Sequence, residues 1–204
     1  MRCRESNSRS EGLLVAAASL CMAVGTACAI DGAVAITARE GTLNLRTGDV
    51  ALDALPNLLH APALTEAHVV LRLDGPLDSL RAAQLKAAGA RLSGYLPTNC
   101  FIAEVSATTP ARLAAAGCVV GIYAYQSEWR IDPVISAAQG DVSVNLWLFE
   151  GQAPGATLAS IGALGGVGVV ETEKVGDGWR IAATGSAANI RSLAAFTGIQ
   201  YVEP

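Results

Sequence analysis

Charged and aromatic side chains are scarce in this sequence, at 16% and 5% of its residues. Asp and Glu outnumber Lys and Arg by 18 to 14, which gives a net charge of −4. Proteins that bind nucleic acids usually carry a basic patch or an Arg-rich stripe, and this sequence has neither. We therefore expect no nucleic-acid partner.

The sequence also lacks the usual machinery of catalysis and metal binding. Its two histidines are His60 and His68, and no Cys/His spacing resembles a zinc site. His60 lies in a proline-interrupted segment, and His68 begins a strand, where we expect it to be half exposed. Cys100 with either histidine could form a thiol–imidazole pair, but a buried cysteine at a strand start is more often inert packing. We predict no catalytic residue, no metal site and no cofactor.

No phosphate-binding motif is present. The glycine-rich stretch 162–168 lacks the GKS or GxGxxG order that opens a phosphate-binding helix. Glu171 and Glu173 lie two residues apart on one face of an expected strand. We interpret them as a pair of carboxylates on a solvated strand and not as an acid–base pair.

Disulfides are not favoured either. Of the five cysteines, Cys100 and Cys118 lie outside the N-terminal region, and one such pair in an exported protein suggests a disulfide. Both begin strands that should flank a common neighbour, which would put them about 10 Å apart, beyond the ~7 Å reach of a disulfide. Buried free thiols are the favoured state, and a disulfide remains the alternative.

An apolar run long enough to span a membrane is missing. The N-terminal run Gly12 to Gly25 is shorter than the ~20 residues that a spanning helix needs. Arg2, Arg4 and Arg9 precede it. A basic start followed by a short apolar run is typical of a secretory signal peptide, so we expect export and no stable membrane span.

The expected signal peptide covers 1–29, because the small-x-small sequence Ala27-Cys28-Ala29 follows the apolar run. Cleavage at the site formed by Ala27 and Ala29 would release a secreted or periplasmic protein through a Sec-type route. Two alternatives stay open. One is an alanine-rich N-terminal helix, and the other is a lipoprotein signal with Cys28 as the lipidated residue.

What the sequence does contain is one order of elements that occurs twice. From residue 68, and again from residue 142, the pattern is strand, helix, strand, strand, helix, strand. This duplication predicts an α+β fold of two tandem ferredoxin-like (βαββαβ) split sandwiches with four-stranded antiparallel sheets. The expected parts are the signal peptide, an extended lead-in (30–66), a first ferredoxin-like domain (67–127), a linker (128–140) and a second ferredoxin-like domain (141–204).

Local patterns support the first copy. Alternate residues of 68–73 are apolar, which predicts a strand with one buried face. Leu77, Leu80 and Leu85 indicate a helix packed through leucine, and Gly89 supplies its left-handed cap.

Turn and cap residues mark the other elements. Thr98-Asn99 suits a tight turn between two strands, and Thr109 with Pro110 opens a second helix. In the second copy, 176–178 predicts a hairpin, and Gly162 weakens the first helix. The expected core includes Val69, Leu71, Leu85, Leu113, Val144, Leu146 and Leu193.

The stretch 71–105 resembles the pro-region of large secreted bacterial subtilisin-like serine proteases. The matching motifs are Gly89-Ala90, Tyr95-Leu96-Pro97 and Asn99-Cys100-Phe101, although Cys100 stands where that family would have Ala. The segment LNLRTGDV (43–50) and the terminal segment 199–204 are also similar to parts of such pro-regions. The family's catalytic Asp-Ser/Thr-Gly, His-Gly-Thr and Gly-Thr-Ser-Met motifs are absent from the sequence.

The resemblance implies a folding aid and temporary inhibitor that is not itself an enzyme. Its expected partner is a subtilisin-like protease domain, in cis or in trans, and the chain is expected to continue beyond Pro204 in the natural protein. The residues implied to contact the protease cleft are Tyr201, Val202, Glu203 and Pro204. Which repeat inhibits is left open. The alternative is a stand-alone secreted or periplasmic binding or adhesion module, and a small enzyme on the same scaffold is a weaker third reading.

Overall fold

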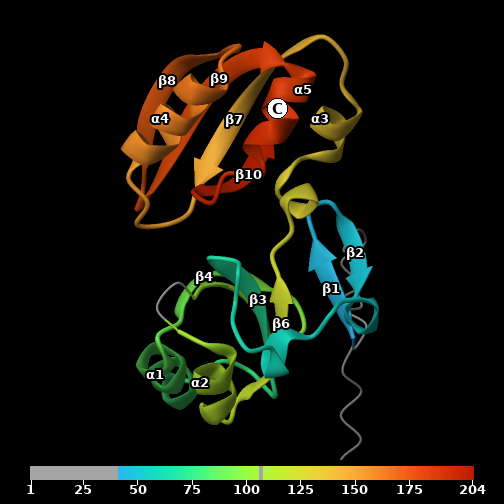
Figure 1. The fold of residues 1–204 in the computed structure, drawn as a ribbon, viewed down its shortest axis with the longest axis vertical. Coiled ribbons are helices and arrows are strands. Elements are labelled where there is room, and N and C mark those ends of the chain that lie inside the picture. The colour runs from blue at the N-terminus through green and yellow to red at the C-terminus, as the bar shows by residue number, and fades with distance from the viewer. Residues whose placement is uncertain (1–40, 106–107) are drawn as a thin grey trace, which may run out of the picture. The chain divides into compact units, whose positions relative to one another are not determined.

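The computed structural model of the protein describes residues 41–105 and 108–204. It contains two four-stranded antiparallel sheets and one two-stranded antiparallel sheet (Figure 1). The prediction of a mixed α/β protein with two four-stranded antiparallel sheets is therefore confirmed, and the two-stranded sheet is an addition to it. Residues 41–105 and 108–204 belong to one compact unit. The signal peptide predicted for 1–29, with its site at Ala27 and Ala29, lies outside the described residues.

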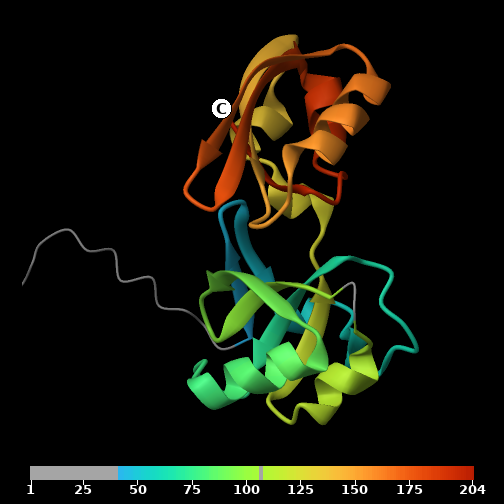
Figure 2. The ribbon, with the colours of Figure 1, turned by 90° about the vertical axis from the view of Figure 1, so that its left-hand side faces the viewer.

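The first sheet has the order β4-β5-β3-β6, so the strand that comes first in the chain is central. Its strands are β3 (His68–Leu73), β4 (Arg91–Leu96), β5 (Cys100–Glu104) and β6 (Val119–Ala124). Two helices, α1 (Ser79–Ala88) and α2 (Pro110–Ala115), lie side by side against one face of this sheet (Figure 2). Leu85 and Leu113 of these helices are buried against Val69 and Leu71, as expected.

The prediction that Leu77, Leu80 and Leu85 pack the first helix is wrong for Leu77 and Leu80. Leu77 precedes the helix, and Leu80 is 67% exposed. The Asp78 side chain accepts a hydrogen bond from the backbone N–H of Arg81 and so starts the helix one residue after itself. This start turns Leu80 to solvent and leaves Leu85 as the buried leucine of the helix.

The caps and turns predicted from the sequence are confirmed. Gly89 ends α1 with φ +94°, and Thr98 and Asn99 join β4 to β5 with φ of +64° and +58°. The Thr109 hydroxyl caps α2. β3 lies between β5 and β6. Cys100 begins β5 and Cys118 directly precedes β6, and both cysteines are free and buried as expected.

The prediction that strand 68–73 buries only one face is wrong. His68 and Val70 are buried along with Val69 and Leu71. A second cluster covers the face of the sheet away from the helices. Its members come from the first sheet, the segment before it, the segment after it and the second half of the chain: Leu43, Leu52, Val70, Cys100, Ile102, Tyr123, Tyr125, Trp129 and Phe149.

Part of that cover comes from the segment expected to be an extended lead-in. It forms a hairpin of β1 (Thr42–Leu45) and β2 (Gly48–Ala51), followed by the 3-10 helices η1 (Leu52–Ala54) and η2 (Leu58–His60). Leu43 and Leu52 are buried. The segment predicted as a linker is likewise structured, with η3 (Ser127–Arg130) and α3 (Pro133–Ala137).

The second sheet has the order β10-β7-β9-β8, which again places the first strand of the copy in the centre. Its strands are β7 (Asp141–Leu148), β8 (Val167–Val175), β9 (Gly178–Ser186) and β10 (Ile199–Glu203). The helices α4 (Pro154–Leu164) and α5 (Ala187–Leu193) cover one face (Figure 2). Val144, Leu146 and Leu193 are buried in this core, as expected.

Candidate functional site

The candidate thiol–imidazole pair does not form. In the ladder between β3 and β5, His68 lies opposite Glu104 and Cys100 lies opposite Arg72. Four residues along a strand separate the two positions by about 13 Å. The Cys100 thiol contacts the carbonyl of Thr98 at 3.6 Å, and burial raises its pKa. A buried, protonated thiol is a poor nucleophile.

His68 is 3% exposed, so the prediction of a half-exposed histidine is wrong. Its ring stacks on Phe149, with centroids 3.6 Å apart and an interplanar angle of 6°. Burial and the charge of Arg130 lower the pKa of His68 to about 4, so the ring is neutral near pH 7. No local sequence pattern indicates this contact, because Phe149 lies 81 positions further along the chain.

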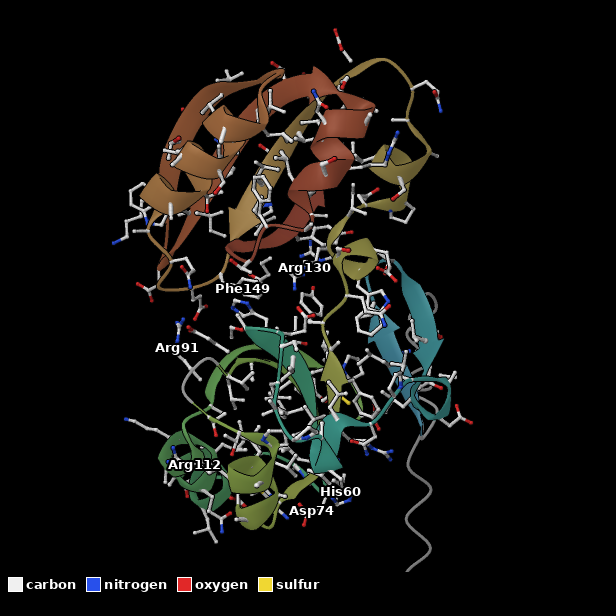
Figure 3. All side chains as sticks on the ribbon, in the orientation of Figure 1. His60, Asp74, Arg91, Arg112, Arg130 and Phe149 are labelled. Atoms are coloured by element: carbon white, nitrogen blue, oxygen red, sulfur yellow. The ribbon has the colours of Figure 1, made fainter. Side chains whose placement is uncertain are left out.

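Arg130, at the end of η3, is a buried cation held by backbone carbonyls. Its guanidinium donates to the carbonyl of Tyr125 at 2.7 Å and lies 3.4 and 3.5 Å from the carbonyls of Phe196 and Ile199. It also lies over the ring of Tyr125, 4.9 Å from the centroid. Figure 3 shows its position next to Phe149. These contacts connect the end of the first sheet to the start of β10.

The predicted cleft-contacting residues belong to the second sheet. Tyr201 and Val202 are buried in β10, which pairs with β7. Glu203 accepts hydrogen bonds from Trp147 Nε1 at 2.6 Å and from Arg46 at 3.1 Å. The carbonyl of Pro204 accepts one from the Asn145 side chain. The segment Tyr201–Pro204 is therefore anchored, and contact with a protease cleft stays a prediction.

The face of the second sheet away from α4 and α5 carries a charged network. Arg180 of β9 donates to Glu171 and Glu173 of β8 at 3.1 and 2.7 Å, and to the Asn145 side chain of β7 at 3.3 Å. Both carboxylates are more than half exposed. Arg180 thus neutralises part of the charge of Glu171 and Glu173, the carboxylate pair noted in the sequence. We call this surface the outer face of the second sheet.

A groove of about 430 Å³ lies between β4 of the first sheet and the strands β7 and β10 of the second. Tyr95 and Gly94 line it on one side, and Trp147, Tyr201 and Glu203 on the other. Sequence reasoning missed it, because its residues are scattered along the chain from Leu45 to Glu203. The available signal was the concentration of tyrosine and tryptophan in a sequence poor in aromatic residues.

Among residues 41–105 and 108–204, no three His, Cys, Asp or Glu side chains gather closely enough to hold a metal ion. None of the helices described there combines the length and the apolar character needed to cross a bilayer.

Comparison with known proteins gives one match. A family model for a domain of unknown function (DUF8729) matches residues 38–126, which is less than half of the chain. The matched range takes in the β1–β2 hairpin together with the first sheet and its two helices. No curated protein matches the chain, and no solved structure matches it.

Proposed function

We propose that this chain is the pre-pro-region of a secreted subtilisin-like serine protease, and that it acts as a folding aid and temporary inhibitor of a protease domain supplied in cis or in trans. The observation that carries the proposal is the duplicated unit. Both four-stranded sheets have the strand order second-third-first-fourth, with two helices on one face. We infer that both are ferredoxin-like split sandwiches, as the resemblance of 71–105 and 199–204 to such pro-regions implies.

The two sheets differ in what they offer a partner. The face of the first sheet away from its helices is covered by the cluster containing Leu43, Trp129 and Phe149. The outer face of the second sheet carries the partly exposed network of Arg180, Glu171 and Glu173. The second repeat is therefore the better candidate for docking a protease, with the first repeat as its support.

The C-terminal segment fits this assignment. β10 belongs to the second sheet, and Val202 is fully buried there. In the proposed complex, Tyr201 and Val202 fix the strand, and Glu203 and Pro204 carry the chain toward the substrate cleft. Main-chain hydrogen bonds of an added strand would supply the affinity there.

The test uses the full chain, the protease encoded with it and a small peptide substrate. We expect competitive inhibition at micromolar concentration and faster refolding of the protease. Thr184→Arg places a charge on the outer face of the second sheet, because Thr184 is exposed and lies four residues from Arg180 on β9. We expect about tenfold weaker inhibition by this variant.

The matched control is Leu80→Arg, which adds the same charge at an exposed position of α1. It should inhibit like the unchanged chain. If the genuine partner protease is neither inhibited nor helped to refold, the proposal fails.

A second candidate function is a stand-alone secreted or periplasmic binding module. The groove lined by β4, β7 and β10 favours it, because ligand sites are concave and lined mostly by apolar and aromatic side chains. The gene downstream of Pro204 separates the two candidates. A reading frame that continues into an Asp-Ser-Gly motif supports the pro-region, and a stop codon supports the module.

A further inference from the structure

The outer edge of β6, the last strand of the first sheet, is occupied by one side chain. β6 is the end strand in the order β4-β5-β3-β6, and no other described strand pairs with its outer edge. The Asn57 side chain accepts a hydrogen bond from the backbone N–H of Ile122 at 3.1 Å and donates one to the carbonyl of Val120 at 3.4 Å. This amide therefore donates to and accepts from the strand edge, as the backbone of an added strand would.

The segment before the first repeat holds Asn57 in this position. Asn57 is the N-cap of η2, and its side-chain oxygen also accepts from the backbone N–H of Leu59 at 3.0 Å. η2 in turn contacts α2 and β6. Leu58 and Leu59 are partly buried against the core of the first sheet. The one-turn helix and its cap thus fix the amide against the edge of β6.

The second repeat has a corresponding arrangement. Asp132 is the N-cap of α3, and its side chain accepts from the backbone N–H of Val134 at 2.8 Å. α3 contacts α5, the second helix of its repeat, as η2 contacts α2 (Figure 1). The backbone N–H of Asp132 donates to the carbonyl of Val202 at 2.9 Å, and Ile131 forms a bridge with Val202. The end strand β10 is therefore also closed by the segment that precedes its repeat.

These contacts fall at the same place in both repeats. Ile122 lies opposite Leu71 in the first sheet, and Val202 lies opposite Leu146 in the second. In each repeat, the N-cap residue precedes that leucine by 14 positions. The duplicated unit is therefore longer than its four strands and two helices, because it begins with a capped turn that reaches the last strand.

β6 lacks the features that usually protect a strand edge. Residues 113–127 contain no charged side chain, and Val120 is 45% exposed. The end strand β8 of the second sheet instead carries Glu171, Glu173 and Lys174 and an irregular register. Charges and bulges of this kind keep an edge from pairing with another chain. The uncharged β6 edge could meet the same edge of a second copy without repulsion.

We propose that each repeat carries its own strap, residues 57–60 in the first repeat and 132–137 in the second, which closes the edge of the last strand. In the first repeat, the strap keeps β6 from pairing with β6 of a second copy of the chain, so the chain stays monomeric. This role does not depend on a protease, and the assays below contain none.

Hydrogen exchange of the full chain tests the bond to Asn57. We expect the amide of Ile122 to be protected, although it lies at a sheet edge. Asn57→Ala should speed its exchange at least about tenfold. Asn57→Asp should retain most of the protection, because a carboxylate oxygen still accepts from Ile122 and Leu59. Unprotected exchange of Ile122 in the unchanged chain would overturn the proposal.

Sedimentation over a concentration series tests the association. The unchanged chain and Asn57→Asp should stay monomeric, and Asn57→Ala should dimerise at micromolar concentration. Adding Val120→Lys to Asn57→Ala should restore the monomer, because a lysine on each edge makes the pair repulsive. Asn189→Ala is the matched control. It removes side-chain hydrogen bonds to the carbonyls of Gly165 and Gly166 at 3.5 and 3.4 Å, away from β6, and should stay monomeric.

Two further results would overturn the proposal. The first is that Asn57→Ala stays monomeric at every concentration although Ile122 has lost its protection. The second is association that Val120→Lys does not reverse, or that Asn189→Ala shows equally, since either places the contact elsewhere than at β6. Asn57→Ser keeps a capping side chain and removes the amide, so it takes the place of Asn57→Ala in both tests if that variant does not fold.

Discussion

His68 is a buried histidine whose two ring nitrogens lack a hydrogen-bond partner among the described residues. Burial lowers the pKa of His68 in the folded chain to about 4, below the ordinary histidine value of 6.5, so the unfolded chain binds a proton that the folded chain does not. Stability is then complete above about pH 6.5 and falls as the pH drops toward 4. The loss from this group is roughly 3 kcal/mol, from 1.36 kcal/mol for each pKa unit.

Urea unfolding at a series of pH values from 7 to 4 measures this loss. His68→Phe keeps the stack on Phe149 and should remove most of the pH dependence in that range. His60→Phe changes the exposed histidine and should leave it intact. A His68→Phe variant that loses as much stability in acid as the unchanged protein would show that carboxylates control the effect.

Replacing Arg130 tests how much its hydrogen bonds to three backbone carbonyls contribute to stability. Arg130→Ala removes the guanidinium that donates to the carbonyls of Tyr125, Phe196 and Ile199, although the carbonyl of Phe196 keeps the N–H of Ile199 as a donor. We expect a loss of about 2–4 kcal/mol in the free energy of unfolding. Arg130→Lys should recover less than half of it, because a single ammonium cannot reproduce the planar guanidinium.

Denaturant unfolding compares these variants with Arg112→Ala. Within the described residues, the Arg112 side chain donates one hydrogen bond, to the carbonyl of Ala87 in an exposed setting, so its loss should cost no more than about 0.5 kcal/mol. An equally small cost for Arg130→Ala would mean that water replaces the guanidinium.

At the scale of the elements, the sequence predicted the strands and helices of both repeats but not what covers them. Alternation along 68–73 identifies a strand, yet one strand cannot reveal that a hairpin at 42–51 and Phe149 bury its second face. Short elements such as η3 and α3 carry no clear periodicity, because each is about one turn long. Their burial depends on partners elsewhere in the chain.

The helix α2 provides a test of the predicted core. Leu113 is fully buried between α2 and the first sheet, so Leu113→Ala should cost about 2–5 kcal/mol. Thermal and denaturant unfolding measure the change. Leu80→Ala is the matched control on α1, and its cost should stay within about 0.5 kcal/mol. Similar costs for both variants would contradict the packing described for the two helices.

At the scale of the whole molecule, the candidate site was predicted only in part. The resemblance singled out Tyr201 to Pro204 as contacts of a protease cleft, which stays a prediction. Of these residues, Tyr201 and Glu203 line the groove, and Val202 belongs to the same strand. The partners of Glu203 are Arg46 and Trp147, and nothing in the sequence connects three positions so far apart. Tertiary contacts of this kind arise from how the two repeats pack, which local patterns do not encode.

The contacts of Phe149 suggest that the two repeats unfold together. Phe149 follows β7 of the second sheet, yet it is fully buried in the cluster on the first sheet, where it meets His68 and Tyr125. The Arg91 side chain adds a hydrogen bond to the carbonyl of Glu150 at 2.6 Å. Among the buried residues of that cluster, Phe149 is the one that comes from the second repeat, so we expect it to carry much of the coupling.

Phe149→Ala should therefore cost about 3–5 kcal/mol and also split thermal unfolding into two transitions, one for each repeat. Calorimetry detects the split as a van't Hoff enthalpy below the calorimetric enthalpy. Phe101→Ala is the control, because Phe101 is buried in the helix-side core of the first sheet alone. It should lower stability to a similar extent and leave the degree of coupling unchanged. If Phe149→Ala still unfolds in one transition, Phe149 does not carry the coupling, and polar contacts such as Arg91 with the carbonyl of Glu150 and Arg46 with Glu203 hold the repeats together.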